Sequence, residues 1–465
     1  MATQQVARRG GRQRAAVLGV AGAALAAAAL AVVSAAHAVG PINGTSPLAP
    51  PLGACLGSQC PANWPTLNNG DFPGRDAAIN IFAGTNFSAT QRAAEIEGKI
   101  VVLGNFTVDK SPGGGLFNVG VAGVGSRVPP PNGDDFLTVG GNVTVAPGTT
   151  MDVGGTDSQG AAFGNLRHAG TVSGTINMTP TGVVVQDTNA VAQYSQLQPY
   201  IEDRSACAAQ APATGTFTLS GSQGTFQGDG TSMLQVFNLP GDIGTAGSAV
   251  DFSFAGIPAG ATILVNMTGA TPIINTNTGF NLAGDPLNAL RSKIMFNFPT
   301  ATTVTMTGGA QFQGSVMTGN PASMLNVSMP GTNGRIYAAG AVSLSSASAG
   351  AEMHSYPFDG LLPDCGTTPP TTPSTTSTTS TTPSTTPSTT PSTTPSTTPS
   401  TTPSTRPHTT PSTPRPTTPS SQPTGHRLAN TGGSGLTETL AFAAFSLAAG
   451  AGALAYTTRK KGSHS

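Results

Sequence analysis

Few side chains in this sequence have the type and spacing that catalysis requires. Of six histidines, only His168 and His354 lie in the part with a globular composition, and neither has Cys, Asp or Glu nearby at the spacing of metal ligands. The adjacent carboxylates Asp134–Asp135 and Glu202–Asp203 are typical of solvated surface charge, since neighbouring residues of a strand point to opposite faces. No G-x-S-x-G motif occurs. We therefore expect no catalytic residue, no metal site and no cofactor.

The alternative to a non-catalytic protein is a β-helical polysaccharide lyase. Such an enzyme needs a carboxylate cluster for calcium and a basic residue that takes a proton. The basic residues are scattered along the sequence, which makes a lyase the weaker hypothesis. Among them are Lys99, Lys110, Arg127, Arg167, Arg204, Arg291, Lys293 and Arg335.

A flat threonine array that orders water, as in ice-binding solenoids, is a further alternative. The run TTVTMTG contains Thr302, Thr305 and Thr307. No regular T-x-T repeat recurs along the chain, so the sequence ranks this function below the lyase.

Four cysteines remain once a leader is removed, and they are candidates for disulfides: Cys55, Cys60, Cys207 and Cys365. Three pairings are possible. Cys55 and Cys60 are near enough to close a short loop, which would leave Cys207 and Cys365 to join a helix to the end of the module. An exported protein can keep such bridges oxidised.

The formal net charge of zero hides an asymmetry. Between residues 39 and 365 there are 10 Lys and Arg against 19 Asp and Glu, a net charge of −9. An acidic segment has no electrostatic attraction for nucleic acid, so we expect no nucleic-acid partner. A charged fraction of 9% with 60 Gly and 39 Pro is also not the composition of a helical enzyme.

Short runs of alternating Val, Thr, Ile and Phe, separated by Gly and Asn, fill residues 76–365, as in KIVVLGNFTV and FLTVGGNVTV. This pattern predicts an all-β module. A recurring V/A-G-G/N-x-T/S-V phrase favours a β-solenoid-like stack of coils, with a β-sandwich-like fold as the alternative. One inserted helix is expected at 189–209, where apolar residues recur at helical spacing, and Pro199 should kink or divide it.

The first 38 residues have the pattern of a secretory signal peptide. Arginines precede an apolar stretch at 15–33, and Ala36 and Ala38 form an A-x-A signal-peptidase site. The mature chain should begin near Val39 with a Pro/Gly-rich lead-in over 39–75, ahead of the module.

The region after the module has no capacity to form a core. Residues 366–427 consist almost entirely of Thr, Ser and Pro, which predicts a disordered, extended stalk. Residues 436–458 are apolar enough for a transmembrane helix, and the basic tail 459–465 should stay in the cytoplasm.

Between stalk and apolar segment stands a pentapeptide, residues 428–432. It resembles the LPxTG-like sorting signal of Gram-positive surface proteins, in the LAxTG form of actinobacteria. The resemblance implies that an LAxTG-preferring sortase cuts between Thr431 and Gly432 and joins the Thr431 carbonyl to peptidoglycan. The recognition residues would be Leu428, Ala429, Asn430, Thr431 and Gly432.

The module itself resembles the choice-of-anchor A family of bacterial surface proteins. The resemblance covers residues 77–363 and includes LTVGGNVTV, IPAGATILVNMTG, GRIYAAGAVSLSS and EMHSYPFDGLLP. It implies a surface-exposed binding module and brings no catalytic residues.

The sequence therefore predicts a secreted, cell-wall-anchored protein that is held transiently in the membrane before sorting. It would be an adhesin or extracellular binding module, and a host matrix protein or a surface polymer could be its partner. A structural envelope or coat protein without a soluble ligand is the alternative, and a β-helix lyase is the less favoured one.

Overall fold

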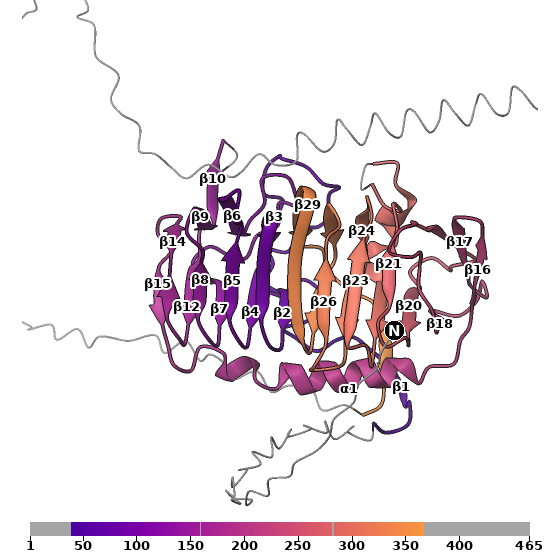
Figure 1. The fold of residues 1–465 in the computed structure, drawn as a ribbon. Helices are drawn as coiled ribbons and strands as arrows, with labels where there is room; N and C mark the ends of the chain where they lie inside the picture. The colour runs from indigo at the N-terminus through magenta and orange to yellow at the C-terminus, as the bar shows by residue number, and fades with distance from the viewer. Residues whose placement is uncertain (1–38, 159, 281–282, 367–465) are drawn as a thin grey trace, which may run out of the picture. The chain divides into compact units, whose positions relative to one another are not determined.

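The computed structural model describes residues 39–158, 160–280 and 283–366. Within them nearly all regular structure is β (Figure 1). The strands form three long parallel faces that the chain visits in turn, so each circuit is one coil of a β-solenoid. The all-β prediction is confirmed, and of the two architectures it allowed the structure has the solenoid.

The first face is a ten-stranded sheet in which all neighbours are parallel. In spatial order its strands are β15 (Val184–Gln186), β12 (Asn165–His168), β7 (Asp135–Val139), β4 (Lys99–Val102), β2 (Ile79–Ala83), β28 (Ile336–Ala338), β25 (Ser315–Thr318), β22 (Ile294–Phe298), β20 (Thr262–Met267) and β18 (Leu234–Leu239).

The second face is also parallel and follows the first one in each coil. Its strands are β13 (Val172–Ser173), β8 (Val143–Val145), β5 (Phe106–Asp109), β3 (Phe87–Glu97), β29 (Ala341–His354), β26 (Met324–Val327), β23 (Thr303–Thr307) and β21 (Ile273–Asn275).

The third face continues from the second because the long strands β3 and β29 turn a corner. β3 pairs with β5 through Phe87–Thr90 and with β6 through Glu95–Glu97. The other strands of this face are β14 (Thr175–Met178), β9 (Thr149–Val153), β6 (Gly115–Gly120), β27 (Gly331–Asn333) and β24 (Gln311–Gln313).

Short elements complete the module. They are β1 (Gly44–Ser46) with β30 (Leu362–Asp364), β10 (Gly155–Asp157) with β11 (Gly160–Ala162), a sheet of β16 (Thr216–Ser220), β17 (Gln223–Gln227) and β19 (Asp251–Ala255), and the 3₁₀ turns η1 (Ala192–Tyr194), η2 (Pro286–Ala289) and η3 (Arg291–Lys293).

The coils are not stacked in the order of the sequence. The chain enters the first face in its middle, at β2, and moves outward to β15. It then re-enters at the opposite end, at β18, and returns until β28 lies beside β2. The two half-solenoids thus meet where β28 pairs with β2 and β29 pairs with β3.

The helix α1 (Leu197–Ala209) lies on the connection between the two ends and packs along the first face, against β20, β22, β25 and β28 (Figure 1). The expected helix at 189–209 is divided into η1 and α1, but the break lies at residues 195–196. Pro199 therefore does not divide it, contrary to the prediction. Pro199 lies in the first turn of α1, where its missing N–H leaves no bond unmade. The helix is therefore the crossover that makes the reversed coil order possible.

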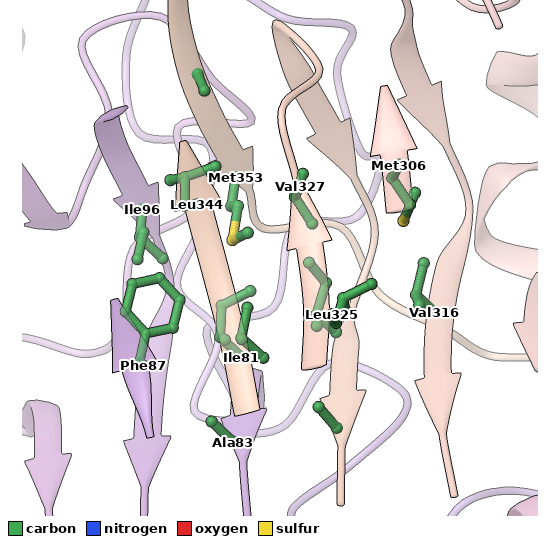
Figure 2. Close-up of a cluster of buried hydrophobic side chains, with 14 of the residues drawn as sticks. Ile81, Ala83, Phe87, Ile96, Met306, Val316, Leu325, Val327, Leu344 and Met353 are labelled. Atoms are coloured by element: carbon green, nitrogen blue, oxygen red, sulfur yellow. The ribbon is translucent and has the colours of Figure 1, made fainter. Parts of the chain in front are cut away.

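The interior between the faces is filled by apolar residues at alternate positions of the strands. Ile81 of the first face and Phe87 and Leu344 of the second are at most 1% exposed and belong to one cluster (Figure 2). Equivalent side chains stack from coil to coil. The rings of Phe87 and Phe106, for example, are stacked with their centroids 5.1 Å apart. Because every strand buries one side here, register is tightly specified.

The corners between the first and second faces explain the G-N phrases of the sequence. The Oδ1 of Asn86 accepts from the N–H of Asn105, whose own Oδ1 accepts from the N–H of Asn142, at 2.9 and 2.8 Å. A Cβ on Gly84 or Gly140 would come within 2.1 Å of a carbonyl oxygen of the neighbouring coil. Gly and Asn are therefore required by close coil stacking.

Candidate binding face

Small polar side chains form a continuous row across the second face. Register places one residue of each strand opposite the next, from β13 to β23. The row consists of Ser173, Thr144, Thr107, Ser88, Ser343, Asn326 and Thr305.

The row points outward because its neighbours along each strand point inward. Thr107 lies between Phe106 and Val108, which are fully buried, and Thr144 is exposed between two buried valines. The same alternation holds on the strands that follow. The core thus fixes which side chains reach the surface.

A shorter row runs parallel to the first, two residues further along the strands. Asp109 pairs with Thr90, and Thr90 pairs with Ser345. Thr307 occupies the equivalent position of β23. Hydrogen bonds from the Ser111 hydroxyl and from the Ser111 N–H, the latter to Asp109 Oδ1 at 2.9 Å, hold the pKa of that carboxyl below its usual range.

Parallel strands repeat at about 4.8 Å, and side chains on one side of a strand repeat at about 6.6 Å. The two rows are therefore a grid of hydroxyl and amide groups with fixed spacing, with the Asp109 carboxylate at one position of the shorter row. Each hydroxyl can both donate and accept a hydrogen bond. Such a grid suits a periodic solid surface better than one small molecule, and it contains no arrangement of nucleophile and base.

The histidines considered above have structural partners. His168 Nδ1 lies 3.1 Å from the carbonyl oxygen of Gly170. His354 is fully buried, with Nδ1 2.9 Å from Asn333 Oδ1 and Nε2 3.1 Å from Glu352 Oε2. The sequence showed no Asp or Glu at metal-ligand spacing from His354, but Glu352 contacts its ring as a hydrogen-bond partner. Glu352, two residues earlier, lies on the same side of β29.

The adjacent carboxylates of the first face have different cationic partners. Asp134 pairs with Lys99 at 3.3 Å, and Asp135 pairs with Arg167 at 2.7 Å. Within the described ranges, no three His, Cys, Asp or Glu side chains gather as metal ligands would.

The four cysteines form two disulfides. Cys55 bonds to Cys60 with their Cα atoms 6.0 Å apart, within the lead-in. Cys207 bonds to Cys365 with a Cα separation of 5.9 Å, which joins α1 to the segment after β30.

Several predicted sites lie outside the described residues. These are the signal peptide with Ala36 and Ala38, nearly all of the stalk, the pentapeptide Leu428–Gly432, the segment 436–458 and the basic tail. In the part of the chain that the structure does describe, no helix has the length and apolarity needed to cross a membrane.

A family model described as "Putative Ice-binding-like adhesive domain" matches residues 77–355. The chain belongs to this family. The match lies inside the module predicted from the sequence and spans both half-solenoids.

One solved structure similar to the chain is the crystal structure of an ice binding protein from an Antarctic Biological Consortium. The two share 13% identity over 64% of this chain and 94% of the other, with a TM-score of 0.29. No curated protein matches the sequence.

Family membership makes the module an adhesive, ice-binding-like domain, in agreement with the predicted surface binding module. Its polar rows could not be predicted from a T-x-T repeat along the chain, because each strand contributes only one or two of their residues. Only Thr305 and Thr307 of the run TTVTMTG lie in the rows, whereas Thr302 donates to the carbonyl oxygen of Ala270. The available signal was the repeated N-F/V-S/T at residues 86–88, 105–107 and 142–144, which marks each corner.

Proposed function

We propose that this chain is a cell-surface adhesin whose module attaches to a periodic solid through the second face, with ice as the ligand. The observation that supports this most is the row from Ser173 to Thr305, in which seven consecutive strands present a small polar group. The ice-binding-like family agrees with it.

The physical argument rests on spacing and rigidity. Each hydroxyl contributes little to the free energy of binding, because it exchanges hydrogen bonds to liquid water for hydrogen bonds to the solid. A rigid sheet places many hydroxyls at once, so little additional conformational entropy is lost on contact. Bulky or charged groups would hold the surfaces apart, and both rows consist mainly of Ser, Thr and Asn. We propose that no catalytic step is involved.

The test measures how much of the purified full-length protein enters slowly growing ice. Thr144→Tyr and Thr305→Tyr place a large ring in the row, and each should lower the incorporated fraction about tenfold, which corresponds to about 1.4 kcal/mol. Thr218→Tyr is the matched control, because Thr218 is exposed on β16, outside both rows. It should leave incorporation unchanged.

Collagens, fibronectin, chitin, cellulose and the producer's peptidoglycan serve as parallel surfaces. Saturable binding to one of these that both row variants weaken, with no affinity for ice, would replace ice by that polymer. If no solid retains the protein but it associates with itself, the coat-protein alternative is correct and the adhesin proposal fails.

We also propose that the adhesin is displayed on the cell wall, as a choice-of-anchor A protein with a sortase anchor would be. The support comes from the order of segments in the sequence: signal peptide, module, Thr/Ser/Pro stalk, LANTG, apolar segment and basic tail. The stalk would carry the module through the wall, and a sortase would transfer Thr431 to peptidoglycan.

Replacement of Thr431 by Ala leaves the backbone carbonyl in place but removes the threonine side chain by which a sortase would select this position. We expect Thr431→Ala to leave the protein in the membrane, where detergent extracts it, and to abolish its release by wall-degrading enzymes. The control is Thr437→Ala, which lies beyond the cleavage point. Full incorporation of Thr431→Ala into peptidoglycan would refute sortase anchoring.

A further inference from the structure

A pocket of about 310 Å³ lies outside the second face. Three segments line it: the lead-in around Cys55, Cys60 and Trp64, the turns η2 and η3 with Asn288 and Arg291, and the chain after β29 with Tyr356 and Asp359. None of these segments contributes to the polar rows. The volume is at the lower end of that found for small-molecule sites, about 300–1,000 Å³.

Trp64, the single tryptophan of the chain, forms an aromatic wall of this pocket. Its ring centroid lies 5.8 Å from that of Tyr356, and the ring planes are tilted by 51°. Tyr356 is fully buried and Trp64 is half-buried. A half-buried indole keeps part of its surface available to an apolar face of a ligand.

Arg291 and Tyr356 form the fixed base beside this wall. The guanidinium of Arg291 lies over the Tyr356 ring, 3.7 Å from its centroid. Arg291 Nη2 and the Tyr356 hydroxyl both donate to the carbonyl oxygen of Pro65, at 2.9 and 3.0 Å. The residue that follows Trp64 is therefore held by two side chains of the pocket, which positions the backbone beside the indole.

The pocket contains polar groups of both charges. Asp359 is exposed and pairs with Lys293 at 3.1 Å, whereas Arg291 is 5% exposed. Asn288, which also lines the pocket, has an uncharged amide that can both donate and accept hydrogen bonds. An anion would meet the Asp359 carboxylate and a cation would meet Arg291. A neutral ligand with many hydroxyls can donate hydrogen bonds to Asp359 and accept them from Arg291, without repulsion from either charge.

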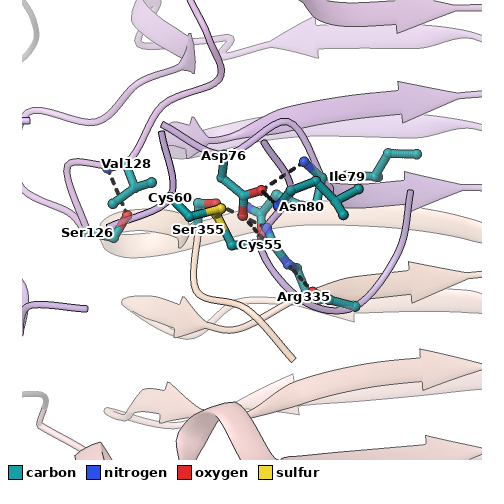
Figure 3. A network of polar contacts seen from close by, with 12 residues as sticks. Cys55, Cys60, Asp76, Ile79, Asn80, Ser126, Val128, Arg335 and Ser355 are labelled. Carbon is teal, nitrogen blue, oxygen red and sulfur yellow. Dashed lines mark hydrogen bonds and ion pairs between the residues drawn. A yellow bond between two sulfur atoms is a disulfide. The ribbon is translucent and has the colours of Figure 1, made fainter. Parts of the chain in front are cut away.

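The walls are connected to the core, so the pocket is present without a ligand. The Asp76–Arg335 ion pair is buried behind it, and Arg335 also donates to the carbonyl of Gly53 and to Ser355 Oγ (Figure 3). These contacts hold the lead-in and the chain before Tyr356 against β28. The Cys55–Cys60 disulfide closes the lead-in loop beside them.

We propose that this pocket is a second binding site, which takes a neutral hexose-type sugar unit. The apolar face of the sugar ring packs on Trp64, and its hydroxyls bond to Asp359, Asn288 and Arg291. This site goes beyond the attachment proposed for the second face, and it would let the adhesin hold a soluble or branched glycan as well as a solid.

The intrinsic fluorescence of the full-length protein tests this directly, because Trp64 is its only tryptophan. Methyl glycosides of glucose, galactose and mannose, together with N-acetylglucosamine, are titrated, with glucuronate as the charged comparison. We expect a saturable change of emission with at least one neutral sugar. Calorimetry then compares the variants, and Trp64→Ala and Asp359→Asn should each weaken binding by about tenfold or more.

Thr144→Tyr should bind the sugar with unchanged affinity, which separates this site from the second face. Trp64→Phe should retain part of the affinity, because a ring remains. Asp359→Asn lies at an exposed position, so its loss of binding is not a folding defect. No response to any neutral sugar, equal affinity in Trp64→Ala, or a clear preference for glucuronate would overturn the assignment, whatever the result with ice.

Discussion

At the scale of residues, the most consequential contacts are buried polar ones where the two half-solenoids meet. Asp76 and Arg335 come from opposite ends of the module and are at most 1% exposed. Asp76 Oδ1 also accepts from the N–H groups of Leu56 and Ala78. Glu97 accepts from the backbone of Ser126, Arg127 and Ser355. Each buried charge is thus compensated by several donors or acceptors.

Removal of one member of the Asp76–Arg335 pair should be costly. Arg335→Met leaves a buried carboxylate without its cation, and we expect it to lower the free energy of unfolding by about 3–5 kcal/mol. Asp76→Asn with Arg335→Met should cost clearly less than the sum of the two single changes. Denaturant unfolding of the four proteins measures this coupling.

Additive effects in that cycle, or a cost under about 1 kcal/mol for Arg335→Met, would contradict a stabilising role of the pair. Lys293→Met is the matched control, because Lys293 pairs with the exposed Asp359 and such surface pairs contribute about 0–1 kcal/mol.

At the scale of elements, α1 is held to the first face by polar contacts at its C-terminal half. Asn266 Nδ2 donates to the carbonyl of Ala208 at 2.9 Å, and Asn297 Nδ2 donates to that of Ser205 at 2.9 Å. The two asparagines also bond to each other. The Cys207–Cys365 disulfide adds a covalent link between the helix and the last described strand.

Loss of that disulfide should destabilise the module more than loss of the other one. Cys207 and Cys365 are 158 residues apart, whereas Cys55 and Cys60 are 5 apart. In the chain-entropy treatment the first bridge contributes about 5 kcal/mol and the second about 2 kcal/mol. Unfolding of the Cys207→Ser/Cys365→Ser and Cys55→Ser/Cys60→Ser proteins compares them. An equal loss of unfolding free energy in the two variants would mean that loop length does not set the stabilisation that each disulfide provides.

At the scale of the whole molecule, the reversed coil order places the first and last coils of the solenoid side by side at its centre. β2 and β3 are paired on both sides, by β4 and β5 in one half and by β28 and β29 in the other. The outer coils have a neighbour on one side only, and the exposed Val183 and Val184 mark one such end.

Native-state hydrogen exchange should follow this arrangement. In a solenoid each coil is stabilised mainly by its neighbours, so opening begins where one neighbour is missing. We expect the slowest amides in β2, β3, β28 and β29 and the fastest among strand amides in β13, β15 and β16. If protection instead increased steadily from one end of the sequence to the other, the two halves would not be joined as one cooperative unit.

Much of the fold could be predicted from local pattern. Alternating Val, Thr, Ile and Phe predicted strands, and the G-N phrases favoured coils, because both depend on contacts within a few residues or on one repeated corner. The helix at 189–209 was found for the same reason. Its role as the crossover could not be predicted, because helical spacing does not indicate at which end of the sheet the next strand pairs.

The candidate sites show the same difference between what local sequence predicts and what tertiary contacts decide. The sequence by itself determined the β-rich module, since composition and period are local properties. The signal peptide, the stalk, the sorting signal and the lack of a catalytic site stay predictions. Only the tertiary structure decided that Ser343 continues the row of Thr107 and Ser88. Ser88 and Ser343 are 255 residues apart (343 − 88), and their strands pair at the seam through backbone hydrogen bonds that carry no sequence signature. It also decided that Trp64, Arg291 and Tyr356 line one pocket, because three distant segments meet only when the second half-solenoid closes on the first.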